Sequence, residues 1–363
     1  MAQRHPETAL ASDDVAAPPC IGSDSAGEVL SHYLHDQAGV FLRALAVTGQ
    51  PDDDSETTLP LRRSARRIAA ALHTYAPLTD PGWAEPFRTE LGWLATTLSR
   101  EHQHAARLAR LLSALHRLAS EEDSPHSYDR LAPPPPGPQP VRARGNETTP
   151  GSGPLAVGAA RAGALLDRQL RLARTRAHSA ALQAMGSSRF HAVADAVAVL
   201  VSDVPLSAAA AAPAAHTLPA LTEQAHARLT DAVGALPLAR AAHPYTADAL
   251  RAALGAEDAA ERQDAPWHRV RSLLRISRYA CEIHPYGDVD AEPAGRLSAA
   301  ARTLEQHREA AEASAAVASA ARTPRIAPAT AYALGVLHTD QRQEVEAARF
   351  AFARLWQRPA SGA

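Results

Sequence analysis

Residues 267–282 read WHRVRSLLRISRYACE, and the fold can be worked out from this stretch. At roughly 100° per residue of an α-helix, its polar side chains share one stripe about 80° wide: His268, Arg271, Arg275, Arg278 and Glu282. Apolar side chains, from Val270 to Cys281, fall towards the opposite side, as an amphipathic helix requires. The stretch therefore predicts a helix with one face suited to anions and one face suited to a core.

The composition of the whole 363-residue chain extends this helical pattern. Alanine, leucine and arginine dominate, whereas β-branched and aromatic residues are scarce, which predicts an all-α protein. The length allows one large domain or two smaller ones. Every basic side chain other than histidine is an arginine, because the sequence contains no lysine, and the formal net charge is -2. A polyanion would therefore have to bind to a local cluster of arginines.

Apolar residues at helical spacing continue along most of the chain. They predict helices over residues 26–47, 61–75, 83–118, 155–185, 190–204, 218–236, 247–254, 297–321 and 328–357. Pro86 predicts a kink near the start of the third of these helices. Pro266 is expected in the first turn of the helix that contains residues 267–282, where the missing N–H of proline has no helical partner to lose.

Two segments differ in composition from the helical regions. Residues 1–23 are rich in Ala, Asp, Ser and Pro and predict a disordered N-terminal tail. Residues 120–154 contain a proline run and predict a mobile connector between a first half, residues 24–119, and a second part, residues 155–358. We expect the proline run to be a spacer, with a docking site for a protein partner as the alternative.

The order of the predicted helices indicates an internal duplication. Arginine-rich helices begin near residues 60 and 266, and each is followed by a Pro/Gly turn and a longer helix. The second of them, with the pattern His-x-x-Arg-x-x-x-Arg-x-x-Arg-Tyr-x-x-Glu from His268 to Glu282, resembles a signature helix of the CHAD family, the conserved-histidine α-helical domain. The resemblance implies two pseudo-symmetric helical bundles within residues 24–358, whose signature helices face each other across a basic groove.

The CHAD family is associated with binding inorganic polyphosphate, so the resemblance also implies a set of binding residues. In the first half, Arg62, Arg66 and Arg67 fit the basic positions of the family, but Leu59 stands where the name-giving histidine is expected. Later in the second half, His307 is a looser match to the helix that follows the signature. The expected polyphosphate-binding residues are Arg62, Arg63, Arg66, Arg67, His268, Arg271, Arg275, Arg278, Tyr279 and His307.

Arginine is chemically suited to this ligand. Its planar guanidinium binds phosphate oxygens in pairs and stays charged when it is partly desolvated. A helix with arginine at every third or fourth position presents the head groups about 5 Å apart, which suits a row of phosphates. The same spacing also fits an ordinary solvated helix face. We expect non-catalytic binding of polyphosphate, and the alternative is a degenerate CHAD module that acts as a helical protein-interaction scaffold without a polyanion ligand.

Two individual side chains allow further expectations. His268 titrates close to neutral pH, so it either adds positive charge and a hydrogen bond for phosphate or packs at the helix start. Glu282 is expected to orient an arginine through an ion pair.

Other functional classes find no support in the sequence. Neither a metalloprotease motif, a phosphate-binding loop, a dinucleotide-binding motif nor a nucleophile elbow occurs, so no catalytic residue and no cofactor is predicted. Glu101, His102 and His104 do not predict a metal site, because residues two apart on a helix point away from each other. Nucleic-acid-binding signatures are also absent. Without a signal peptide or a membrane-length apolar run, we expect a cytoplasmic protein, and polyphosphate granules are a place to which it could be recruited.

Overall fold

The computed structural model describes residues 24–48, 58–122, 154–243, 257–284 and 292–357, and these form helices without a β-sheet. The prediction of an all-α protein is confirmed. In chain order the α-helices are α1 (Ala26–Thr48), α2 (Thr58–Thr74), α3 (Pro81–Glu122), α4 (Pro154–Met185), α5 (Ser188–Leu200), α6 (Ala214–Gly234), α7 (Leu238–Ala241), α9 (Glu257–Ile283), α10 (Glu292–Ala321) and α11 (Pro328–Gln357). Two short 3-10 helices are η1 (Ala76–Leu78) and η3 (Ala208–Ala211).

Most predicted helices agree with the observed ones to within a few residues. The predicted helix over residues 190–204 ends earlier, at Leu200, and the helix predicted from residue 218 begins at Ala214. Pro86 lies near the start of α3, which continues through it as one helix. Three predictions fall outside the described residues: the N-terminal tail, most of the proline-rich connector and the short helix over residues 247–254.

The predicted start of the signature helix at Pro266 is wrong, because α9 begins at Glu257 and carries Pro266 in its interior. A proline inside a helix removes one backbone hydrogen bond and costs roughly 3 kcal/mol. Tertiary contacts oppose this cost here. Asp264, just before the proline, is buried and forms ion pairs with Arg342 and Arg349 of α11. These contacts hold the first turns of α9 in place ahead of the proline.

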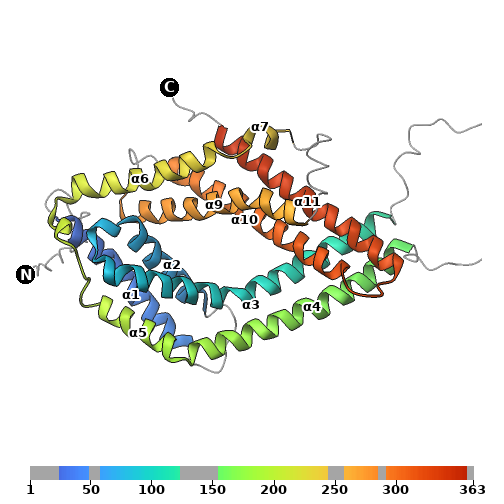
Figure 1. The fold of residues 1–363 in the computed structure, drawn as a ribbon, viewed down its shortest axis with the longest axis horizontal. Helices are drawn as coiled ribbons and strands as arrows, with labels where there is room; N and C mark the ends of the chain where they lie inside the picture. Colours follow the sequence, from blue (N-terminus) through green and yellow to red (C-terminus); the bar gives the residue numbers. More distant parts are fainter. Residues whose placement is uncertain (1–23, 49–57, 123–153, 244–256, 285–291, 358–363) are drawn as a thin grey trace, which may run out of the picture.

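The long helices form two long sides that meet at both ends, as Figure 1 shows. The helices α3 and α4 run along one long side, and α6, α9, α10 and α11 run along the other, while α1, α2 and α5 lie at one end. At the opposite end, α3 and α4 meet α10 and α11. The helices α4 and α11 approach closely there, since a Cβ atom added at Gly158 would lie 2.2 Å from the carbonyl oxygen of Ala329.

Three apolar cores hold this arrangement together. The first joins α1, α2, α5, the first part of α3 and the start of α6. The second joins the second part of α3 to α4, α10 and α11. The third joins α9 to the end of α6, the start of α10 and the end of α11. Because α3, α10 and α11 each contribute to more than one core, packing fixes the long helices relative to one another.

The predicted division into two pseudo-symmetric bundles remains a prediction. The second core contains α3 from the first half of the chain and α4, α10 and α11 from the second part, so the two parts of the chain share a core. The arginine-rich helices α2 and α9 also contact each other directly. The family resemblance implies two bundles, whereas the described helices pack as one connected body.

A buried charged cluster lies between α9, α10 and α11. Asp264 Oδ2 accepts a hydrogen bond from Arg342 Nη1 at 2.8 Å, and its other oxygen accepts one from Arg349. Arg349 also donates to Glu346 at 2.6 Å and to His307 Nε2 at 3.3 Å. All five side chains are buried. Burial alone would raise the pKa of Asp264, but the hydrogen bonds from Arg342 and the charges of Arg342 and Arg349 hold it well below its usual value.

Replacing Asp264 tests how strongly this cluster stabilises the fold. Asp264→Ala leaves Arg342 and Arg349 buried without their shared carboxylate, so we expect the free energy of unfolding to fall by about 3–5 kcal/mol. The matched control is Asp167→Ala, which breaks a surface pair with Arg171 and should change it by less than about 1 kcal/mol. Urea denaturation of both variants measures the difference. Equal, small effects would contradict the structural role assigned to Asp264.

Candidate functional site

A cavity of about 290 Å³ lies between α2, α3, α9 and α10, and it is called the arginine cavity from here on. Its walls are predominantly charged, and arginines come from all four helices: Arg62 and Arg66 from α2, Arg107 and Arg110 from α3, Arg271 and Arg275 from α9, and Arg308 from α10. An adjoining hollow of about 410 Å³ shares Arg66, Arg271 and Arg275 and adds His73 and Arg88.

Helical spacing explains why these side chains meet. Arg62 and Arg66 are four residues apart on α2, and Arg271 and Arg275 are four residues apart on α9, so each pair projects from one face of its helix. The opposite faces pack into the cores, as Leu274 does on α9. Two arginines from each of these helices, which are far apart in sequence, therefore reach the same cavity.

Three of the cavity arginines have no ion-pair partner in the described part of the chain. Arg62, Arg66 and Arg275 form no ion pair with any residue that the structure describes. Arg62 donates only a long hydrogen bond to the carbonyl oxygen of Leu98, at 3.4 Å, and its buried Nε has no acceptor within the described chain. Burial lowers the pKa of all three guanidinium groups, and the charges of neighbouring arginines lower it further, while Glu305 and Tyr279 only partly offset this for Arg66 and Arg275. Such uncompensated positive charge favours an anion from outside the chain.

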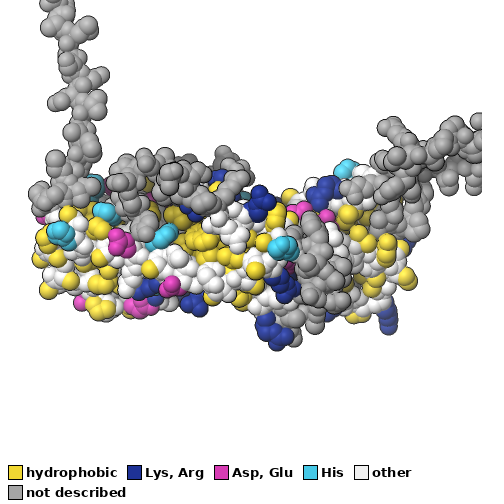
Figure 2. All heavy atoms as spheres, turned by 90° about the horizontal axis from the view of Figure 1, so that it is seen from above, with side chains coloured by type: hydrophobic (Ala, Val, Ile, Leu, Met, Phe, Trp, Pro, Cys, Tyr) yellow, Lys and Arg dark blue, Asp and Glu magenta, His cyan; other side chains and the backbone are white. Residues whose placement is uncertain are grey.

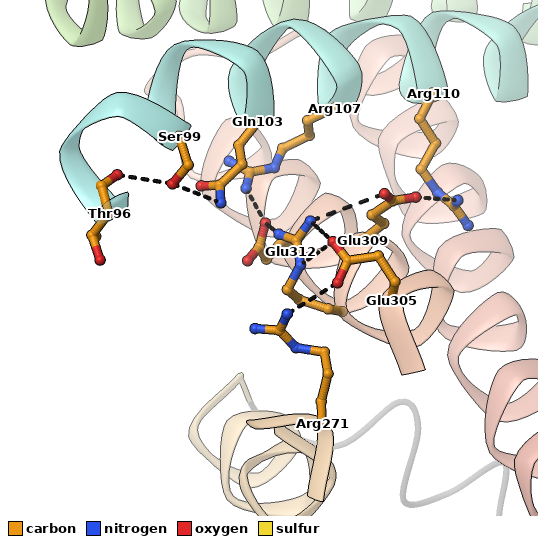
Figure 3. Close-up of polar contacts among 10 residues, drawn as sticks. Thr96, Ser99, Gln103, Arg107, Arg110, Arg271, Glu305, Glu309 and Glu312 are labelled. Carbon is orange, nitrogen blue, oxygen red and sulfur yellow. Dashed lines mark hydrogen bonds and ion pairs between the residues drawn. The ribbon is translucent and has the colours of Figure 1, made fainter. Parts of the chain in front are cut away.

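The other four cavity arginines form ion pairs with three glutamates of α10, as Figure 3 shows for most of them. Arg271 pairs with Glu305 at 3.0 Å, and Arg107 pairs with Glu312 at 2.5 Å. Arg308 pairs with both of these carboxylates at 2.6 Å. Arg110 reaches Glu309 at 3.9 Å. The cavity is thus divided into a part with free positive charge and a part whose charge is already balanced.

Positive charge is less concentrated on the face seen in Figure 2. Among the side chains drawn in colour there, arginines stand in separate small groups, with acidic and histidine side chains between them.

A family model described as "CHAD domain" matches residues 32–317. This chain is a member of the CHAD family. A solved structure, PptA from Streptomyces chartreusis, is 51% identical in sequence, with a TM-score of 0.71, and the alignment covers 92% of this chain and 100% of that one. No match was found among the curated proteins. The resemblance inferred from residues 268–282 is confirmed, and α11 lies beyond the matched region while packing along α10.

The two histidines expected in the CHAD site lie away from the arginine cavity. His268 is not among its lining residues and instead borders a hollow between α9, α10 and α11. Its ring packs edge-on against His307, with 5.4 Å between the ring centres. His307 is only 1% exposed and stacks on Trp267. Burial lowers the pKa of His307 to about 4 despite the nearby Asp264, so this side chain is neutral at pH 7 and belongs to the buried cluster.

Arg67 and Tyr279 form a separate polar group at the edge of the CHAD fold. Arg67 donates two hydrogen bonds to Glu282, at 2.7 and 3.1 Å, and its guanidinium lies over the ring of Tyr279 at 5.3 Å. Tyr33 of α1 donates to the same carboxylate at 2.9 Å. The expectation that Glu282 orients an arginine is confirmed. Neither Arg67 nor Tyr279 is among the residues that line the arginine cavity.

The remaining expected residues also lie outside the cavity lining. Arg63 is exposed, one residue from Arg62 and therefore about 100° around α2. Arg278 is half-buried and does not line either hollow that contains the cavity arginines. Four of the ten expected binding residues thus meet in the cavity: Arg62, Arg66, Arg271 and Arg275.

Sequence reasoning missed three cavity arginines. Arg107 and Arg110 lie three residues apart on α3, a spacing that places both on one face and could have identified them. Arg308 follows His307 directly, and no local pattern distinguishes it from an ordinary helix charge. Its role depends on the approach of α10 to α3 and α9, which the sequence pattern does not reveal.

Two other kinds of site find no support in the described parts of the chain. No cluster of three or more histidine, cysteine, aspartate or glutamate side chains there has the geometry to hold a metal ion. No helix among those residues combines the length and the apolar character needed to cross a membrane.

The uncompensated charge leads to a prediction about stability. Arg275→Met keeps an unbranched side chain while removing a half-buried charge that is repelled by Arg66, so we expect the free energy of unfolding to rise by about 0.5–2 kcal/mol, the range of a single stabilising substitution. Arg271→Met, one turn earlier, breaks an ion pair with Glu305 and should not stabilise the protein. Urea denaturation without added anions separates the two. If Arg275→Met destabilises as much as Arg271→Met, Arg275 has a structural role.

Proposed function

We propose that this CHAD protein binds inorganic polyphosphate in the arginine cavity and does not act on it chemically. The observation that carries the proposal is the set of three arginines, Arg62, Arg66 and Arg275, that are buried or half-buried and have no carboxylate partner among the described residues.

The chemistry of the cavity matches the chemistry of the ligand. Polyphosphate carries about one negative charge per phosphate along an unbranched chain, and it presents oxygens as hydrogen-bond acceptors only. Guanidinium groups supply donors only, and they stay charged even when desolvated. The free Nε–H groups of Arg62 and Arg271 supply two further buried donors for such oxygens. Hydrogen-bond donors and positive charge are sufficient to hold a polyanion in the cavity, and binding without catalysis requires no further chemical group there.

The position of His268 bears on the weakened first-half motif. Leu59 of α2 stands where the family's histidine is expected, and such a loss would be expected to reduce binding. His268 itself borders a different hollow from the arginine cavity. Arg62 and Arg66 of α2 reach the arginine cavity without that histidine. This supports polyphosphate binding over the alternative of a scaffold that has lost its ligand.

Cellular context forms part of the proposal. A polyphosphate-binding protein in the cytoplasm would be recruited to polyphosphate granules through its ligand. The proline-rich connector, residues 120–154, would serve as a spacer or as the docking site for a protein partner.

Substitution of the uncompensated arginines tests the proposal. Each lost charge-assisted hydrogen bond to phosphate costs about 1.5–3 kcal/mol, so Arg66→Ala with Arg275→Ala should raise the dissociation constant for long-chain polyphosphate at least about a hundredfold. The charge-matched control, Arg168→Ala with Arg176→Ala on the exposed face of α4, should change it only a few-fold. Isothermal titration calorimetry measures both variants.

The same titrations can also contradict the proposal. Binding should weaken steeply as salt rises, by analogy with counterion release from nucleic acids. Release of orthophosphate during incubation would show that the protein acts on its ligand. Equal losses from the cavity variant and the α4 variant would mean that polyphosphate binds to general surface charge, and absence of binding by the unsubstituted protein would favour the scaffold alternative.

A further inference from the structure

The glutamates of α10 occupy positions in the cavity where an anion would otherwise bind. Glu305, Glu309 and Glu312 are spaced by four and three residues, which puts them on one face of the helix. Figure 3 shows this face directed towards Arg107 and Arg110 of α3. All three carboxylates line the same cavity as the arginines.

The cavity has two parts, which differ in whether their arginines form ion pairs with these carboxylates. The first part, formed by Arg62, Arg66 and Arg275, is called the open subsite. The second part, formed by Arg107, Arg110 and Arg308 with Glu309 and Glu312, is called the masked subsite. Arg107 and Arg308 each contact Glu312, at 2.5 and 2.6 Å, and Arg308 also pairs with Glu305. Arg110 lies 3.9 Å from Glu309 and 3.8 Å from Glu344 of α11, so the charges of the masked subsite are largely neutralised within the protein.

The carboxylate of Glu312 is charged under ordinary conditions. Burial alone would raise its pKa, but the charges and hydrogen bonds of Arg308 and Arg107 outweigh burial and lower it. Glu312 therefore competes with an incoming phosphate for the same guanidinium groups at neutral pH. Glu305 differs in position, because its charge also acts on Arg66 and Arg275 in the open subsite.

We propose that Glu309 and Glu312 mask a second anion subsite at Arg107, Arg110 and Arg308, so that these glutamates limit how much affinity a polyphosphate chain gains from its length. The inference rests on the proposed function and adds specificity-determining residues to it. A short anion fills the open subsite and leaves the masked one untouched. A longer chain continues into the masked subsite, where each phosphate must replace a carboxylate that remains nearby on α10.

The physical consequence is a dependence on chain length. Phosphates that follow an anchored one arrive at high effective concentration, so each free arginine pair ahead of them would add strongly to the affinity. In the masked subsite, carboxylate repulsion and competition cancel much of that gain. Removing the two carboxylate charges should therefore strengthen the binding of long chains and leave the binding of short anions nearly unchanged.

The experiment compares two ligands with two proteins. The key variant is Glu309→Gln with Glu312→Gln, which keeps the side-chain volume and leaves Glu305 and its contacts in place. We expect its dissociation constant for long-chain polyphosphate to fall about tenfold or more, while that for tripolyphosphate changes less than about threefold. The matched control is Glu90→Gln, which alters a glutamate of α3 that pairs with Arg189 outside the cavity, and it should change neither constant.

A milder variant keeps the test decisive if the double variant is unstable. Glu309→Gln alone removes a partly exposed carboxylate whose contacts with Arg110 and Arg308 are long, at 3.9 and 4.0 Å. It should shift long-chain binding in the same direction by a smaller factor. Circular dichroism melting of each variant verifies that the fold is retained.

Each alternative outcome has a separate meaning. Weaker binding of both ligands would show that the glutamates only position the arginines, and an equal gain for both ligands would show a general field effect; either result overturns the masked subsite while leaving the proposed function intact. If the unsubstituted protein binds neither ligand, the proposed function fails and the inference fails with it.

Discussion

Electrostatic repulsion between arginines is the constraint on which the rest of this structure depends. Arg66 and Arg275 come from different helices, and the charge of Arg66 contributes to lowering the pKa of Arg275. Like charges that are partly desolvated would separate if their helices were free to move. Here they are held by α2 and α9, which pack into two different apolar cores. The packing of the fold thus keeps the arginines in an arrangement that an external anion would relieve.

Helix α10 connects the stabilising and the functional parts of the molecule. One face carries Glu305, Glu309 and Glu312 towards the arginine cavity. Another face buries His307 against Trp267, within the charged cluster of Asp264 and Arg349. Because both sets of contacts are fixed to one helix, the position of the glutamate row depends on the buried cluster behind it.

Much of the fold follows from local patterns, and the limits of the site predictions have physical causes. Apolar periodicity locates most helices, but Pro266 does not start its helix as predicted, because the ion pairs of Asp264 that hold the preceding turns depend on α11. The stripe on α9 identifies Arg271 and Arg275 correctly as neighbours, yet the stripe is longer than the cavity, so His268 at its beginning faces a different hollow. A stripe of residues shows on which side of a helix the side chains point. It does not show how far along that helix the cavity extends.

A second limit of the site predictions concerns contacts between helices that lie far apart in the sequence. The contact between Arg107 and Glu312 joins residues 205 positions apart, and no local pattern contains that information. Family resemblance supplies the ligand class but also adds His307, which is buried. Only the packed structure distinguishes arginines that face a carboxylate from arginines that do not, and this distinction underlies the proposed function.

A crystal structure of the protein with bound polyphosphate would test the central claim most directly. We expect a row of phosphates inside the arginine cavity, with oxygens within hydrogen-bonding distance, about 2.7–3.1 Å, of the Arg66 and Arg275 guanidinium groups. The helices around the cavity should keep their positions, because the cores hold them. Phosphates bound only to outer surfaces, such as the exposed face of α4, with Arg66 and Arg275 left without an anion, would contradict the account.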